Sequence, residues 1–92
     1  MKIELNNIVK RTPEMVFSKL DGEVVMMSVE NGEYYGLNEI GSAIWERISD
    51  EIKVDDLVVQ LMEEYDVERA ECEADTIEFL EEMAEKKLVV VF

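Results

Sequence analysis

Histidine is missing from this chain of 92 residues, and Cys72 is its single cysteine. Without histidine, the chain cannot form the Ser-His or Cys-His pairs that activate many nucleophiles. One cysteine cannot close an internal disulfide, and it does not supply the several ligands of a zinc site. Cys72 lies on the apolar face of a predicted helix between Glu71 and Glu73, which disfavours a reactive thiolate. These absences predict a non-catalytic chain that needs no metal or cofactor.

Basic residues are also scarce, because nine Lys and Arg stand against 23 Asp and Glu for a formal net charge of −14. Nucleic-acid binding needs a basic surface, and the largest basic groupings are Lys10-Arg11 and Lys86-Lys87. The charge therefore disfavours nucleic acid and anionic membranes, and it favours a partner with basic character. So many acids also mean that neighbouring carboxylates do not by themselves indicate catalysis.

Long apolar runs and targeting signals are absent as well. No segment approaches the roughly 20 apolar residues of a membrane-spanning helix, and no basic segment followed by an apolar one opens the chain. The four glycines form no phosphate-binding motif such as G-x-x-x-x-G-K-[ST]. Because 48% of the residues are hydrophobic, we expect a folded protein, with residues 1–92 forming one soluble, cytoplasmic domain.

Two dipeptides divide the first half into predicted strands. Asp21-Gly22 and Asn31-Gly32 favour type I′ turns, in which both central residues have positive φ. They predict a three-stranded antiparallel meander over about residues 14–20, 23–30 and 33–37. The upstream segment NNIVKR is ambiguous and can also be read as a further short strand.

The second half has apolar residues at helical spacing. Asn38 is a good N-cap for a helix with Ile40, Ile44 and Ile48 on one face. A second helix is expected from Val54, and a third from about residue 68 to 86. The closing LVVVF is rich in β-formers and is expected to pair or pack. The predicted fold class is α+β with the order βββααα.

The third predicted strand, EYYGL at residues 33–37, is not explained by the core. Tyr34 and Tyr35 point to opposite faces because side chains alternate along a strand. Gly36 and, in the first helix, Gly41 are each expected to mark close approach of another backbone. One side of this strand stays free after pairing, and a free edge is a template for strand addition by a peptide. The open alternative is that a helix, the tail or a dimer partner covers it.

At this strand the sequence resembles the PqqD-like proteins, small modules described as RiPP recognition elements. The segment NGEYYGLNEIGSAIWERI carries the matching pattern, which consists of Gly32, the Tyr-Tyr pair, Leu37-Asn38, Gly41 and Ile44-Trp45. The later segment also resembles the family's second and third helices, including the EYDV joint and Asp75. Lys53 departs from an expected Ser or Thr cap, and Lys87 from a frequent helix-ending Gly.

The resemblance, over about residues 10–90, implies a winged-helix-like fold and a peptide chaperone. Such modules capture the leader of a ribosomally made precursor as an added strand. They present it to a modifying enzyme, such as a radical SAM protein, as in PQQ biosynthesis, or a leader protease. The resemblance implies a peptide-binding set from the strand and the third helix: Glu33, Tyr34, Tyr35, Gly36, Leu37, Cys72, Asp75, Thr76, Phe79 and Glu82.

Two other functions are weighed against this module. A winged-helix DNA-binding regulator has a similar order of helices, but the net charge of −14 argues against it. A structural subunit would instead form a homodimer through its free edge strand. Within the leading hypothesis, Asp75 and Glu82 favour a basic side chain on the leader.

Overall fold

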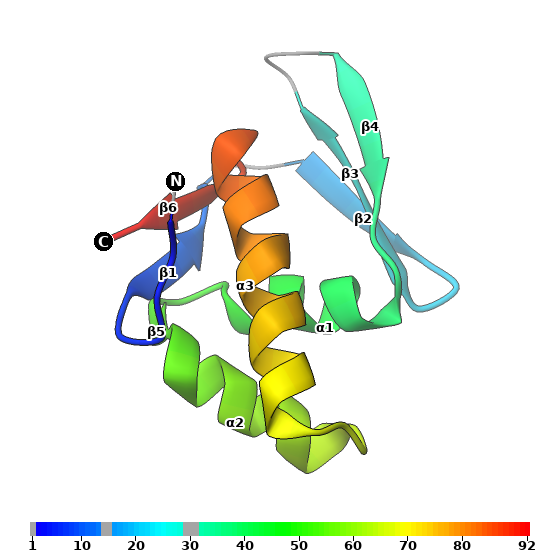
Figure 1. Ribbon diagram of the computed structural model, residues 1–92. Coiled ribbons are helices and arrows are strands. Elements are labelled where there is room, and N and C mark those ends of the chain that lie inside the picture. The colour runs from blue at the N-terminus through cyan, green and yellow to red at the C-terminus, as the bar shows by residue number, and fades with distance from the viewer. Residues whose placement is uncertain (1, 14–15, 29–31) are drawn as a thin grey trace.

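The computed structural model describes residues 2–13, 16–28 and 32–92 (Figure 1). It is an α+β structure with three helices and two three-stranded antiparallel sheets, in the orders β5-β1-β6 and β2-β3-β4. The elements in chain order are β1 (Ile8–Arg11), β2 (Val16–Leu20), β3 (Glu23–Ser28), β4 (Glu33–Gly36), α1 (Glu39–Arg47), β5 (Ile52–Lys53), α2 (Val54–Glu64), α3 (Arg69–Glu85) and β6 (Val89–Val91). In the described part of the chain, no helix combines the length and apolar character that crossing a membrane requires.

The predicted meander is the sheet β2-β3-β4. Asp21 and Gly22 have φ of 53° and 83°, as a type I′ turn requires. Gly32 has φ of 67°, while Asn31 lies outside the described residues. Residues 14–15 of the first predicted strand and 29–30 of the second also lie outside them. Leu37 extends the ladder of β4 by one bond, because its N–H donates to the carbonyl of Val24 at 2.8 Å.

The order βββααα is incomplete, because three further short strands form a separate sheet. Residues 8–11 of the ambiguous segment pair on one side with β5 and on the other with β6, so that Val9 faces both Ile52 and Val91. The expected pairing of the C-terminal tail is thereby confirmed. Figure 1 shows this sheet on one side of α3 and the β2-β3-β4 sheet on the other.

The core centres on α1. The side chains of Ile44, Trp45 and Ile48 are fully buried, and the rings of Trp45 and of Phe17 from β2 form a T-shaped pair with centroids 5.9 Å apart. The Arg11 guanidinium stacks 5.4 Å from the Trp45 ring centroid. These contacts hold α1 against β1 and β2. The same helix also fixes the end of β4.

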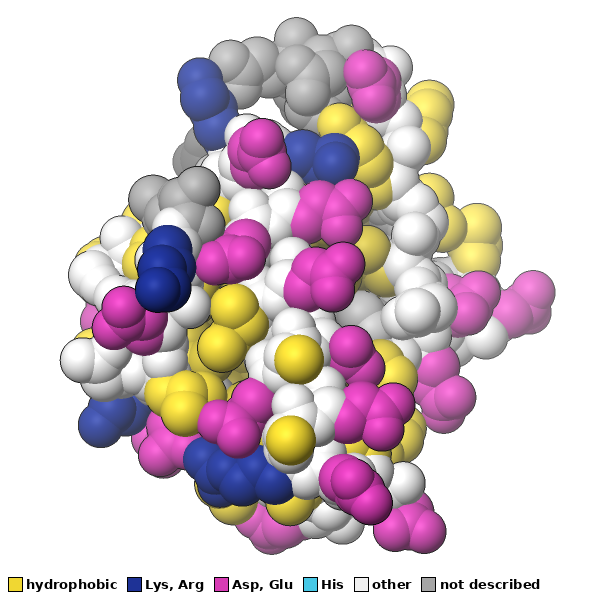
Figure 2. All heavy atoms as spheres, viewed as in Figure 1, with side chains coloured by type: hydrophobic (Ala, Val, Ile, Leu, Met, Phe, Trp, Pro, Cys, Tyr) yellow, Lys and Arg dark blue, Asp and Glu magenta, His cyan; other side chains and the backbone are white. Residues whose placement is uncertain are grey.

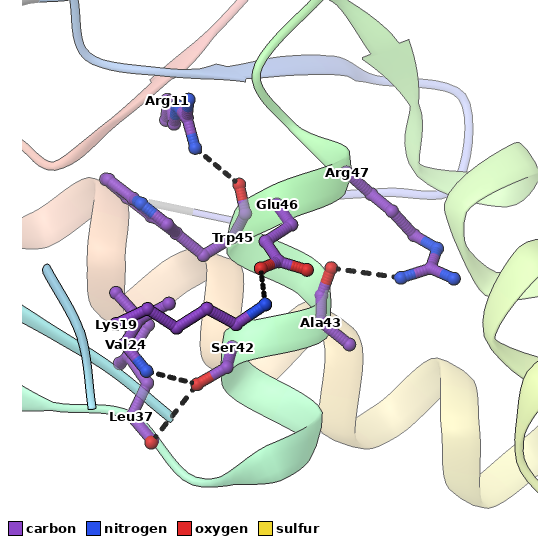
Figure 3. A network of polar contacts seen from close by, with 9 residues as sticks. All are labelled: Arg11, Lys19, Val24, Leu37, Ser42, Ala43, Trp45, Glu46 and Arg47. Atoms are coloured by element: carbon purple, nitrogen blue, oxygen red, sulfur yellow. Dashed lines mark hydrogen bonds and ion pairs between the residues drawn. The ribbon is translucent and has the colours of Figure 1, made fainter. Parts of the chain in front are cut away.

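A buried serine connects α1 to the meander (Figure 3). The Ser42 hydroxyl accepts a hydrogen bond from the Val24 N–H at 2.8 Å and donates one to the Leu37 carbonyl at 3.2 Å. Ser42 therefore satisfies one backbone group of β3 and one at the end of β4. The Asn38 side chain caps α1 by accepting from the Gly41 N–H at 2.8 Å. Together these bonds set where β4 stops and where the helical layer begins.

Candidate functional site

A groove of about 350 Å³ lies between β4 and the C-terminal half of α3. Its lining residues are Tyr34, Tyr35, Gly36, Leu37, Asn38, Phe79, Glu82, Met83 and Lys86. Lys86 meets the Tyr35 ring and Phe79 meets the residues just after β4, so β4 and α3 run in opposite directions along the groove. The groove therefore has an end near Lys86 and an end near Phe79.

The backbone of β4 forms one wall of this groove with an open edge. Within the described residues, β4 pairs only with β3. Since the Leu37 N–H bonds to Val24, the alternation of an antiparallel ladder turns the N–H and C=O of Gly36 and Tyr34 away from β3. In the described part of the chain, a Cβ built on Gly36 would meet no atom within 4 Å. No backbone of the described residues therefore approaches Gly36 closely, and the space beside it is open.

The two tyrosines have the alternation that the sequence predicts. Tyr35 pairs with the buried Met26 and packs against the core, whereas Tyr34 is 74% exposed on the other face. The Lys86 ammonium lies 5.5 Å from the Tyr35 ring centroid and 3.4 Å from the Glu82 carboxylate. This end of the groove therefore presents an aromatic ring and charges of both signs.

Phe79 lies at the other end of the groove. A Cβ at Gly41 would meet the Phe79 ring at 3.1 Å, the Asn38 side chain at 3.2 Å and the Leu37 Cβ at 3.4 Å. The expectation of a neighbouring backbone at Gly41 is therefore wrong, because side chains occupy that space. The missing side chain of Gly41 lets the Phe79 ring lie over the start of α1.

The predicted α3 residues divide between two pockets. Phe79 and Glu82 line the groove, whereas Cys72, Asp75 and Thr76 line a second pocket of about 170 Å³. Cys72 and Thr76 are buried, and the Cys72 sulfur lies 3.9 Å from the Val58 carbonyl. Of the predicted β4 residues, Tyr34, Tyr35, Gly36 and Leu37 line the groove. Glu33 lies outside it, where its carboxylate accepts a hydrogen bond from the Tyr35 hydroxyl at 3.4 Å.

Three groove residues are not among the predicted set: Asn38, Met83 and Lys86. A helical pattern contains the signal for two of them, because Phe79, Glu82, Met83 and Lys86 follow the spacing i, i+3, i+4, i+7. The sequence predicts that Met83 is a core residue and that Lys86 lies at the helix end. Each residue has that role and also lines the groove. Met83 is 5% exposed, and Lys86 is the C-cap of α3.

This geometry suits an extended chain more than a small reactant. Outward backbone donors and acceptors lie beside a groove whose walls combine aromatic, apolar and charged side chains. Acidic side chains flank α3 on the face seen in Figure 2. Among the described residues, no three His, Cys, Asp or Glu side chains are grouped so that they could hold a metal ion.

Comparison with known proteins gives matches over most of the chain. The family model of coenzyme PQQ synthesis protein D (PqqD) matches residues 23–89. The structure of TbiB1 in complex with the TbiA(beta) leader peptide is 32% identical, with a TM-score of 0.79 over 87% of this chain and 93% of that one. A lasso peptide synthetase B1 complexed with its leader peptide is 27% identical, with a TM-score of 0.77 over 89% and 96%.

A third structure shares the fold at lower identity. It is the PqqD truncation of Methylobacterium extorquens PqqCD, a stand-alone RiPP recognition element. That protein is 18% identical, with a TM-score of 0.74 over 90% of this chain and 88% of that one. A search of curated proteins gave no significant match. The family model and the 32% identity to TbiB1 agree, and the chain belongs to the PqqD family.

Proposed function

We propose that this chain is a non-catalytic module that captures the leader of a ribosomally synthesised precursor peptide as a strand added to β4. The observation that carries the proposal is the outward backbone of Tyr34 and Gly36 beside a groove of about 350 Å³. Two of the relatives are solved with a leader peptide bound. Backbone pairing gives affinity for many sequences, and the side-chain pockets give selectivity.

The predicted peptide-binding residues take different roles in this proposal. The residues of β4 and Leu37 offer the backbone, with Glu33 positioning the Tyr35 hydroxyl from outside the groove. Phe79 and Glu82 contact side chains of the added strand from α3. Cys72, Thr76 and Asp75 act beyond the end of β4, at the second pocket.

The module then presents its peptide to a modifying enzyme, either a radical SAM protein or a leader protease. We assign this work to residues 1–92 acting as one domain in the cytoplasm, with a winged-helix-like arrangement in which β2-β3-β4 is the wing sheet. The family and its two relatives solved with leader peptides support an enzyme partner, because a leader serves to bring a precursor to its enzyme.

Gly36→Pro tests the added strand. The substitution removes an N–H that points away from β3, so it should leave the meander folded and weaken peptide binding at least about tenfold. The peptide is selected from a displayed library of short random sequences, and its affinity is measured by fluorescence anisotropy. Lys19→Pro is the matched control, since it introduces proline on β2 at the opposite edge of the same sheet.

Equal losses in the two proline variants would contradict the strand-addition mechanism. Amide chemical shifts recorded during the titration should change along residues 33–37 and α3. Changes confined to other parts of the chain would remove the site assignment. Light scattering separates the homodimer alternative, because a stable dimer that buries the β4 edge would leave no edge for a peptide.

A further inference from the structure

The second pocket is lined by Cys72, Asp75 and Thr76, which share one stripe of α3 with the groove residue Phe79 by helical spacing and lie nearer the N-terminus of that helix. Its full lining is Ile40, Leu61, Tyr65, Val67, Glu71, Cys72, Asp75 and Thr76. Asp75 and Thr76 are about one helical turn before Phe79, and Ile40 follows Asn38 by two residues. The helix wall of the groove and the segment that follows β4 therefore both also contribute residues to the pocket, and Phe79 lies between the two sites along α3.

The chemistry of the pocket is that of a site for a basic side chain with an aliphatic stem. Its interior is formed by apolar residues such as Ile40, Leu61 and Cys72, and the Tyr65 ring lies among them. Exposed carboxylates of Glu71 and Asp75 stand at its rim. Lys and Arg bury their methylene stems against apolar surface and keep their charged ends in water near opposite charges.

The rim carboxylates are also available. Among the ion pairs of the described residues, none engages Glu71 or Asp75. The nearest basic residue along the chain, Arg69, is held by Asp55 and Glu73 instead. The carboxylate of Asp55 raises the pKa of Arg69 through a hydrogen bond, so this cation stays charged and bound away from the pocket. A cationic ligand at the rim would thus meet two acids with no competing partner among the described residues.

We propose that this pocket binds one Lys or Arg side chain of the captured peptide, N-terminal to the segment that pairs with β4. This inference rests on the proposed function. The β2-β3-β4 sheet is antiparallel throughout, so an added antiparallel strand has its N-terminal end at the Phe79 end of the groove. Phe79 follows Cys72 by seven positions, a rise of about 10 Å along the helix, which an extended peptide crosses in about three residues.

The experiment selects binders from a displayed library of short random peptides against three proteins. These are the wild-type chain, the double variant Glu71→Gln/Asp75→Asn, and the charge-matched control Glu78→Gln/Glu85→Gln on exposed positions of α3. Peptides selected on the wild type and on the control should both be enriched in Lys or Arg about three residues N-terminal to the apolar residues that occupy the groove. The Glu71→Gln/Asp75→Asn variant should lose this preference and keep the apolar one.

A selected peptide then gives the quantitative test. The Glu71→Gln/Asp75→Asn variant should bind it about tenfold more weakly than the control variant, and replacing the basic residue by Met should remove the difference. Two results would overturn the pocket assignment and leave the added strand intact. One is that the selected peptides show no enriched basic residue, and the other is that both double variants lose peptide affinity equally. Binding that survives Gly36→Pro would overturn the added strand itself, and the proposal that rests on it.

Discussion

At the scale of single residues, Ser42 has the clearest energetic role. Its hydroxyl is the hydrogen-bond partner of the buried Val24 N–H, and it also donates to the Leu37 carbonyl. Ser42→Ala should lower the free energy of unfolding by about 1–3 kcal/mol, because a buried backbone donor loses its partner. Urea unfolding followed by fluorescence measures this, since Trp45 is the single tryptophan and is fully buried.

Ser49→Ala is the control for that measurement. Ser49 is exposed after the end of α1, and its substitution should change stability by less than about 0.5 kcal/mol. If both alanine variants unfold at the same urea concentration, the Ser42 bonds do not anchor the meander.

The sequence predicted backbone conformation better than it predicted which side chains pack against each other. Asp21-Gly22 determined its turn locally, because positive φ is a property of those residues themselves. The environment of Gly41 depends on Phe79, which is far along the chain and meets it only through the packing of α3. A glycine pattern states that space is needed, but it does not state which group fills it.

At the scale of elements, the backbone at the C-terminal end of α3 is strained at Lys87, where the family resemblance indicates a frequent Gly. Lys87 has φ of 62°, and the N–H groups of Leu88 and Lys87 bond to the carbonyls of Met83 and Ala84 as in a Schellman motif. Lys87→Gly should raise the free energy of unfolding by about 0.5–1 kcal/mol, since left-handed backbone costs a non-glycine residue more than glycine loses in chain entropy. Thermal and urea unfolding check this.

Lys86→Gly, one position earlier in the chain, is the control for this prediction and should have the opposite effect on stability. Lys86 has φ of −84°, so glycine there removes no strain and should destabilise the helix end. A gain in stability from both glycines would mean that the positive φ at Lys87 is not the cause. The resemblance to the family pointed to a Gly at position 87, and the positive φ of Lys87 gives the physical reason.

Local elements were predictable, but the second sheet was not. The three helices and the meander follow from caps, periodicity and turns within a few residues. The pairing of β1 with β6 joins Val9 to Val91, and β5 has only two residues, so no local pattern identifies these partners. The same limit applies to α3, where one stripe of the helix is divided along its length, with Cys72 and Thr76 at one pocket and Phe79 and Glu82 at the other.

At the scale of the whole molecule, the main feature is the large negative net charge. A net charge of −14 on 92 residues makes the folded chain repel itself. Raising NaCl from about 0.01 M to about 1 M shortens the Debye length from about 30 Å to about 3 Å and should raise the melting temperature by a few degrees. A thermal scan over this range tests it. A lower melting temperature would mean that ion pairs such as Arg47 with Glu64 outweigh the repulsion.

The pairing of β1 with β6 has a topological consequence. Phe92 donates a backbone hydrogen bond to Ile8, and Figure 1 shows both chain ends together on the side of α3 away from β4. A tether attached at either end would leave the same face and would not cross the β4 edge. Fusion to another protein through either end, or insertion into a loop through both, would therefore leave the proposed peptide-binding edge of β4 accessible.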